Sequence, residues 1–154
     1  MTVANVVLVA ALVASGLIAG LFYAYACSVM PGLARGDDKT LVEAMRGINV
    51  AIINPVFMLT FLGAPLLAAV AVFLHLRSSA LPWIIAGAVF LLAMIVITGA
   101  FNIPLNNALD SGRGGYAELR AAFEATWVRW NVLRAVVSTA GFACLVAAVL
   151  TNRS

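Results

Sequence analysis

The sequence predicts an all-α protein, a bundle of four transmembrane helices that run up, down, up and down. Composition is the first reason, since 64% of the 154 residues are hydrophobic and 10% are charged. A soluble domain is roughly 45–50% apolar and about 25% charged. A soluble domain of this size could not bury the excess. We therefore expect residues 1–154 to form a single integral membrane domain.

The spacing of charged residues is the second reason. Four runs contain no Asp, Glu, Lys or Arg: residues 1–34, 47–74, 78–109 and 135–152. A membrane-spanning helix needs about 20 apolar residues. The last run is barely long enough, so we extend its helix back to residue 130. The predicted spans are residues 3–30, 54–76, 82–104 and 130–150.

The first span contains a pair of glycines four residues apart, Gly16 and Gly20. Small residues at this spacing allow two membrane helices to approach closely. Packing inside the bundle is the stronger interpretation of the pair. A homo-oligomer built on the same face is the alternative.

The first connection, "PGLARGDDKTLVEAMRGIN", begins with a Pro-Gly stop. Thr40 and Glu43 then have the spacing of a capping box, which satisfies free amide groups at a helix start. Apolar residues follow at helical spacing, and we expect them to form the buried face of a short interfacial helix: Leu41, Val42, Met45 and Ile48.

The other connections differ in length. Between the second and third spans, "HLRSSALP" is predicted to be a simple connector. Between the third and fourth spans, a glycine-rich turn, "SGRGG", precedes "YAELRAAFEATWVRW", and we expect a second short interfacial helix there. Connections of these lengths fit an up-down-up-down bundle.

Positive charge predicts the orientation in the membrane. The first and third connections with their flanks hold most of the cations: Arg35, Lys39, Arg46, Arg113, Arg120, Arg129 and Arg134. The opposite side holds Arg77 and Arg153. The positive-inside rule places the two cation-rich loops in the cytoplasm. We expect the membrane to be a bacterial plasma membrane.

The end of the third span, "FNIPLNNALD", holds three asparagines within six positions. Asn102 and Asn106 share a helix face if the helix continues through Pro104. One interpretation is structural, because proline frees a backbone carbonyl that nearby polar side chains can satisfy. The other is that the amides form one wall of a ligand pocket.

A polar and aromatic stripe runs into the fourth span through Trp127, Asn131 and Arg134, with Trp130 beside it. An interfacial aromatic belt with snorkelling arginines would explain it structurally. More such residues are expected at the same end of the bundle: Tyr23, Arg46, Asn49 and Asn54. Polar groups in a membrane are costly and tend to mark function. Their convergence from all four spans predicts a ligand pocket.

Donors and cations dominate this set, which suits a flat lipophilic aromatic molecule whose oxygen becomes anionic, such as a phenol, an enol or a quinone. The predicted catalytic residues are the oxyanion-stabilising donors Asn102, Asn106, Asn131 and Arg134. The predicted substrate-binding residues are Tyr23, Arg46, Asn49, Asn54, Trp127 and Trp130. We expect contact with membrane lipid and no nucleic-acid partner.

Neither a metal nor another cofactor is predicted. The two cysteines, Cys27 and Cys144, fall inside apolar spans, where buried thiols are the expected interpretation. The one histidine, His75, is expected at the other end of the bundle. No spacing of cysteines and histidines is typical of a metal site.

Three segments together carry a family resemblance. They are "GLFYAYACSVMPGL", the N-x-P-L-N-x-x-L pattern that starts at Asn102, and the W-x-x-W-N-x-x-R pattern that starts at Trp127. With these motifs the chain resembles the anthrone oxygenase-like membrane family. The resemblance implies a four-helix integral membrane protein. For fungal polyketide-pathway members it also implies oxidation of an anthrone to an anthraquinone by dioxygen, without flavin or haem.

Three functions stay open from the sequence. The first is an oxygenase or other oxidoreductase that acts on a lipophilic aromatic molecule with dioxygen. The second is a non-catalytic binder or carrier of a quinone-like molecule, and the third is a membrane assembly partner. An oxygenase that forms an enolate needs a base. The sequence does not single one out. Asp110, Glu43 and Glu124 are expected at the right end of the bundle but near water, and water or a surface carboxylate could suffice if the enolate is strongly stabilised.

Overall fold

The computed structural model describes residues 2–152, and all the regular structure in this part of the chain is helical. Four helical stretches are long and apolar enough to cross a membrane: Val3–Leu33, Pro55–Leu74, Leu81–Ser111 and Tyr116–Thr151. The prediction of an all-α protein with four membrane-spanning helices is therefore confirmed.

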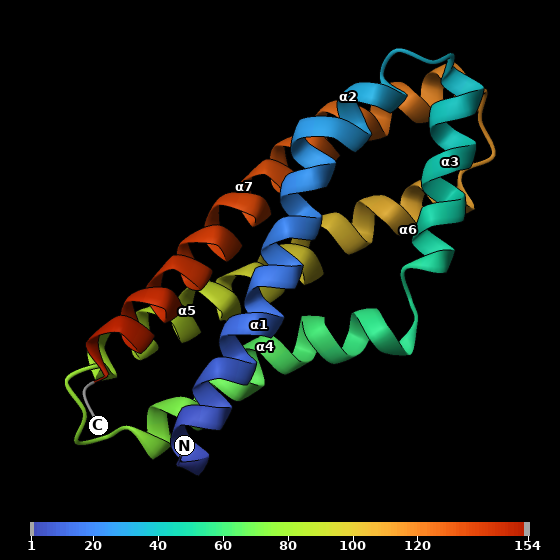
Figure 1. Cartoon of the computed structure of the whole chain (residues 1–154). Coiled ribbons are helices and arrows are strands. Elements are labelled where there is room, and N and C mark those ends of the chain that lie inside the picture. The colour runs from blue at the N-terminus through green and yellow to red at the C-terminus, as the bar shows by residue number, and fades with distance from the viewer. Residues whose placement is uncertain (1, 153–154) are drawn as a thin grey trace.

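The long helices pack as a ring (Figure 1). Helix α1 (Val3–Ala24) contacts α4 (Pro55–Leu74) and α7 (Tyr116–Thr151), and α5 (Leu81–Ile97) closes the ring against α4 and α7. The start of α1 and the end of α7 lie at the same end of the molecule. From there the chain passes back and forth along the bundle.

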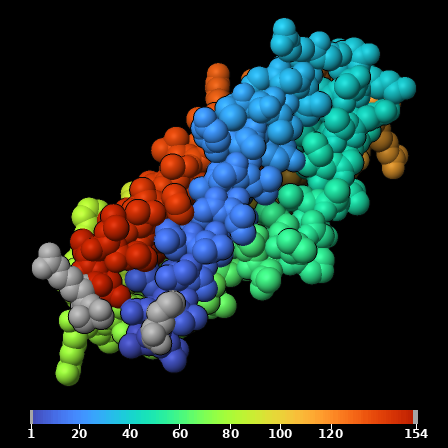
Figure 2. All heavy atoms as spheres, in the orientation of Figure 1, coloured from blue at the N-terminus to red at the C-terminus, as the bar shows by residue number. Residues whose placement is uncertain are grey.

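The opposite end of the bundle is extended by shorter helices. Helix α3 (Asp38–Ala51), in the first connection, packs against α7 and α6 (Ile103–Ser111). Figure 2 shows α3, in teal, forming the surface of the molecule between the end of α1 and the start of α4. Since α4 is shorter than the other spans, α3 covers the side of the bundle that α4 leaves open.

Two of the spans contain a short π-helical segment. Segment η1 (Tyr25–Val29) separates α1 from α2 (Met30–Leu33), and η2 (Thr98–Asn102) separates α5 from α6. In both cases a proline is the second residue after the segment, Pro31 or Pro104. A proline in a regular α-helix clashes with the carbonyl four residues before it. The wider π turn accommodates that carbonyl, because the amides of Met30 and Ile103 bond five residues back.

Two predicted span boundaries are wrong, because the helices continue through the π segments and the prolines that follow them. The first span continues past Pro31 to residue 33, and the third continues past Pro104 to residue 111, whereas ends at residues 30 and 104 were expected. The prolines widen these helices and do not end them. Asn106 therefore lies in the same continuous helix as Asn102.

The fourth span is also longer than predicted. Helix α7 begins at Tyr116 and runs without a break to Thr151, so no separate interfacial helix forms before residue 130. Only residues 112–115 separate it from α6. The reason is a continuous buried face, because Phe123 and Trp127 are buried at the same helical spacing as Asn131.

Helix α3 forms in the first connection with the expected buried face. Leu41, Val42 and Met45 are completely buried, and Ile48 packs against the same cluster. The expected capping box is wrong. Asp37 is the N-cap, and its Oδ1 accepts a hydrogen bond of 2.7 Å from the Thr40 amide.

Asp37 makes the start of α3 sensitive to pH. Hydrogen bonds from the side chain and backbone of Thr40 lower the pKa of Asp37 below its usual value of 3.8. A carboxyl whose pKa is lower in the folded state stabilises the fold above its unfolded pKa. This contribution is lost as the pH falls through the lower, folded pKa. We expect amide hydrogen exchange in the first turn of α3 to rise over that range below pH 3.8 and to lose this pH dependence in Asp37→Asn.

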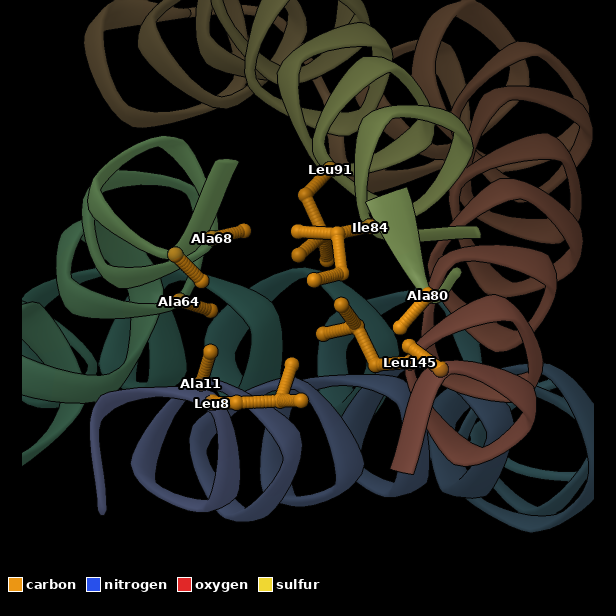
Figure 3. Close-up of a cluster of buried hydrophobic side chains, with 10 residues drawn as sticks. Leu8, Ala11, Ala64, Ala68, Ala80, Ile84, Leu91 and Leu145 are labelled. Carbon is orange, nitrogen blue, oxygen red and sulfur yellow. The ribbon is translucent and has the colours of Figure 1, made fainter. Parts of the chain in front are cut away.

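An apolar cluster fills the bundle near the start of α1 and the end of α7 (Figure 3). Small side chains of α4, Ala64 and Ala68, face larger residues of the neighbouring helices, among them Leu8, Ile84 and Leu145. All these residues are almost completely buried. Alanines allow α4 to lie close to α1, while the leucines and isoleucine fill the remaining space.

A second close approach joins α5 to α7. A Cβ added at Gly87 would lie 3.2 Å from the carbonyl oxygen of Gly141, and one added at Gly141 would lie 3.3 Å from the carbonyl oxygen of Gly87. The two glycines of the predicted pair in α1 have different surroundings. Gly16 packs against the ring of Phe142, whereas a Cβ at Gly20 would meet nothing within 4 Å.

We expect Gly141→Val to destabilise the bundle, because the new side chain would meet the α5 backbone. Overpacking of this kind typically costs about 1–3 kcal/mol. Gly20→Val is the matched control and should leave the stability nearly unchanged. Thermal unfolding of both variants in detergent measures the difference. Equal unfolding temperatures would contradict the close approach of Gly87 and Gly141.

Candidate functional site

A cavity of about 310 Å³ lies at the end of the bundle where α3 packs. Its walls come from α1, η1, α3, α4, η2, α6 and α7, so it needs every span and the first connection. Ligand cavities in proteins are about 300–1,000 Å³, mostly apolar, with a few convergent polar groups. This cavity has the same character.

Aromatic and aliphatic side chains form most of the wall. Phe57 and Phe61 stack with their ring centroids 5.0 Å apart on α4. Phe22 of α1 meets Phe61 edge to face at 6.4 Å. The rest of the apolar lining includes Tyr25, Met45, Ile48, Ile52, Met58 and Ile103. A flat hydrophobic ligand would find rings on several sides.

Arg134 brings a buried positive charge into this wall. The side chain is 7% exposed, and its Nη2 donates to Asn131 Oδ1 at 2.8 Å. The guanidinium carbon lies 4.1 Å from the ring centroid of Phe22 and 5.5 Å from that of Trp127. Aromatic faces attract a cation but do not neutralise it.

No carboxylate pairs with Arg134 within residues 2–152. The salt bridges in this part of the chain all involve Arg120, which contacts Asp38 and Glu124. Nε of Arg134 is buried and has no hydrogen-bond partner there. A buried guanidinium without an anion is costly. It is therefore suited to stabilising an anionic oxygen on a ligand.

Asn106 supplies a second donor, and its orientation can be assigned. Trp127 Nε1 donates to Asn106 Oδ1 at 2.7 Å. An indole N–H can only donate, so the oxygen of the amide must face it. The Nδ2 group of Asn106 is thereby left to donate elsewhere, and Asn106 lines the cavity. Arg134 and Asn106 thus provide donors from two different helices.

Asn49 and Asp110 form the third polar part of the cavity. Nδ2 of Asn49, on α3, donates to Oδ1 of Asp110, on α6, at 3.2 Å. Asn49 is buried, whereas Asp110 is exposed at the edge of the cavity. This bond joins α3 to α6 across the wall of the site.

Two arginines hold α3 and the rest of the first connection against the cavity. Arg46 of α3 donates to the carbonyl oxygens of Leu109 and Gly112, at 2.8 Å each for Nη2, and so satisfies the end of α6. Arg120 of α7 donates to the carbonyl oxygens of Ala34 and Gly36, at 2.9 and 3.0 Å. These bonds fix the first connection, and with it α3, over the cavity.

The structure brings four of the ten predicted site residues to the cavity: Asn49, Asn106, Trp127 and Arg134. Asn131 lies behind the wall. It accepts from Arg134 and donates to the Phe22 carbonyl at 3.3 Å, so it positions the guanidinium.

Asn102 also lies behind the wall and does not line the cavity. It is fully buried, and neither its Oδ1 nor its Nδ2 has a partner among the described residues. Buried amides are nearly always hydrogen-bonded. It belongs to η2, the π segment whose other end, Thr98, does line the cavity.

Four of the expected substrate-binding residues lie elsewhere. Tyr23 is 62% exposed on the outer surface of α1, because it is one residue away from the inward-facing Phe22. Asn54 caps α4 by accepting from the Phe57 amide at 3.0 Å. Trp130 stacks on Phe101 with 3.5 Å between ring centroids, and Arg46 bonds to the end of α6.

The apolar part of the site includes aromatic residues that were not among the predicted site residues. Phe22 and Tyr25 are three residues apart on the inward face of the first span, and Phe57 and Phe61 are four apart on the second. This spacing was the available signal. The spacing of apolar residues does not identify the inward face of a membrane helix, because the outward face is equally apolar.

A family model described as anthrone oxygenase matches residues 55–144. This is more than half of the chain and includes Asn106, Trp127 and Arg134. The chain belongs to the anthrone oxygenase family. The expected resemblance is thus confirmed. No curated protein and no solved structure was found to match the chain.

Within residues 2–152, no three His, Cys, Asp or Glu side chains lie close enough together to hold a metal ion. His75 lies away from the cavity lining and places Nδ1 2.8 Å from the Ala71 carbonyl oxygen. The absence of a cofactor remains a prediction from the sequence.

We expect Trp127→Phe to lower the free energy of unfolding by about 0.5–1.5 kcal/mol more than Trp130→Phe does. Both changes remove the same atoms, but Trp127 is buried and donates a hydrogen bond to Asn106, whereas Trp130 is half-buried. Chemical or thermal unfolding in detergent provides the comparison. Equal destabilisation by the two changes would contradict the burial of Trp127 and its hydrogen bond to Asn106.

Proposed function

We propose that this member of the anthrone oxygenase family is an integral membrane oxygenase that oxidises a lipophilic, enolisable aromatic ketone with dioxygen. The observation that carries the proposal is the buried Arg134 guanidinium, which has no acidic partner among residues 2–152 and lines the same aromatic cavity as Asn106. Such a group stabilises an oxygen that becomes anionic during a reaction.

The size of the cavity supports a substrate of a few fused rings. An engineered apolar cavity of about 150 Å³ in another protein holds one benzene ring. The cavity here is about 310 Å³. A molecule of two or three fused rings would fill a space of this order. A tricyclic anthrone is a substrate of this kind.

The donors would favour the enolate form of an anthrone. When the ring methylene loses a proton, the electron pair of its C–H bond moves toward the carbonyl oxygen. That oxygen becomes an oxyanion, which the guanidinium of Arg134 and Nδ2 of Asn106 would stabilise. Because the site is largely apolar, these charge-assisted interactions are stronger than they would be in water.

Dioxygen then completes the reaction. The electron-rich carbon transfers an electron to dioxygen, and the two radicals combine into a carbon-bound peroxide. After protonation the hydroperoxide loses water and leaves a second ketone. One molecule of anthrone and one of dioxygen thus give one anthraquinone and one water. One oxygen atom enters the product, and the other leaves with the two methylene hydrogens.

The test is dioxygen uptake together with quinone formation by the purified protein in detergent, using an unsubstituted anthrone and subtracting the uncatalysed rate. We expect Arg134→Met to lower the rate enhancement by about 10²–10³-fold, as removal of an oxyanion donor does in other enzymes. Asn106→Leu should lower it by a smaller factor, because a neutral donor is lost.

Arg129→Met is the matched control, since Arg129 is an exposed arginine on the same helix. It should leave the rate unchanged. Equal rates with and without protein would overturn the oxygenase proposal. If the protein then bound anthrone or a quinone without turning it over, it would be a carrier that uses the same cavity. A protein that bound neither would be better explained as a membrane assembly partner.

A further inference from the structure

The carboxylates of the chain differ in what they bind. Five lie away from the cavity. Asp37 caps α3, Asp38 and Glu124 pair with Arg120, and Glu43 accepts from the Tyr116 hydroxyl at 2.7 Å. Glu118 is exposed and lies against Gly114. Asp110 is the sixth, and within residues 2–152 it is the one carboxylate that lines the cavity.

Asp110 is held in a defined position. Its Oδ1 accepts a hydrogen bond of 3.2 Å from Asn49 Nδ2, and Asn49 is only 7% exposed. No side chain or amide among the described residues donates to Oδ2 in the structure. Asp110 forms no salt bridge within residues 2–152 either. The salt bridges in that part of the chain join Arg120 to Asp38 and Glu124. A carboxylate with a free oxygen at the edge of an apolar cavity can accept a proton.

Asp110 lies at a different position along the cavity from the two oxyanion donors, Arg134 and Asn106. The hydrogen bond between Trp127 and Asn106 places these residues at one level, and the guanidinium carbon of Arg134 lies 5.5 Å from the Trp127 ring. Asp110 follows Asn106 by four residues, which is about one helical turn or ~6 Å along the axis. Arg134 and Asn106 would thus contact one part of a bound molecule, and Asp110 would contact another.

This arrangement matches the two changes that enolisation makes in a ketone. The carbonyl oxygen gains negative charge at one position, while a carbon some bonds away loses a proton at another. A ligand whose oxygen meets Arg134 and Asn106 would direct a different part of its ring system toward Asp110.

We propose that Asp110 is the general base that removes the ring proton, and that Asn49 is the positioning residue that orients its carboxylate. The inference rests on the proposed oxygenase function. Oδ2 of Asp110 forms a bond to the proton of the methylene C–H group as that C–H bond breaks. The electron pair moves into the ring system and reaches the oxyanion beside Arg134. Asp110 becomes neutral and later returns its proton to the peroxide.

Removal of the proton can be measured without dioxygen. An anthrone deuterated at the ring methylene is incubated anaerobically with the protein in ordinary water, and loss of deuterium is followed by mass spectrometry. The wild type should accelerate exchange above the buffer rate. Asp110→Asn should lose most of this acceleration, since a general base contributes typically 10²–10⁴-fold. The new amide keeps the oxygen that Asn49 bonds to, so the fold of the site should be retained.

Two further variants test the role of the carboxylate. Glu118→Gln removes an exposed carboxylate near the start of α7 and should exchange deuterium as fast as the wild type. In Asp110→Ala, added formate should restore exchange in proportion to its concentration, because it can occupy the vacated space and accept the proton. Undiminished exchange in Asp110→Asn, or no rescue by formate in a folded Asp110→Ala protein, would overturn the assignment.

Asn49→Leu tests the positioning role separately. It should lower kcat for quinone formation with little change in KM, because the carboxylate is present but poorly oriented. Formate should not rescue this variant, since Asp110 still occupies its position. An unchanged kcat would overturn the role of Asn49.

Failure of the base assignment can be told apart from failure of the proposed function. If the wild type takes up dioxygen with anthrone but does not accelerate deuterium exchange, Asp110 is not the base and the oxygenase function stands. If the wild type accelerates neither process, both proposals are overturned.

Discussion

Burial of Arg134 is the constraint on which the arrangement of the site depends. An ion in the membrane-spanning part of a bundle must be surrounded by groups that compensate for lost water. Here Asn131 accepts one hydrogen bond from it, and the rings of Phe22 and Trp127 lie against the guanidinium. Asn131 is in turn bonded to the Phe22 carbonyl. The charge therefore fixes α7 against α1 at the depth of the cavity, and it remains available to an anionic ligand.

The π segments adapt two helices to this end of the bundle. Both precede a proline by the same number of residues, and both contribute a residue to the cavity, Tyr25 from η1 and Thr98 from η2. Single turns of π-helix occur frequently at functional sites. In this chain they have a local cause, since the wider turn accommodates Pro31 or Pro104. Because the spans continue beyond the prolines, α6 carries Asn106 and Asp110 along the cavity wall.

Helix α3 completes the cavity without crossing the bundle. Arg46 and Arg120 hold it through backbone carbonyls, and Arg120 also pairs with Asp38 in the first turn of α3. Met45 and Ile48 close the apolar wall, while Asn49 reaches Asp110. The first connection thus supplies part of the cavity wall. Three of the seven cations expected to set the orientation also have structural or site roles: Arg46, Arg120 and Arg134. Fewer cations are therefore free to act through the positive-inside rule.

The sequence by itself determined the membrane class, the four spans, the buried face of α3 and the end of the bundle that carries the polar groups. These features follow from composition and periodicity, which act locally along the chain. Asn49, Asn106, Trp127 and Arg134 could be predicted as cavity residues because polar side chains are conspicuous in apolar helices.

Only the tertiary structure decided which inward-facing groups meet. Tyr23 and Tyr25 are equivalent by composition, yet Tyr25 lines the cavity and Tyr23 is exposed. The continuous α7 and the passage of two helices through prolines likewise depend on packing that no single segment encodes. By sequence, Asp110 is one of several carboxylates near the loops. The structure separates it from the others, because Asp110 binds Asn49 whereas the other carboxylates have partners such as Arg120, Thr40 and Tyr116. Contacts between helices distant in sequence set those partners, which is why spacing alone could not identify them.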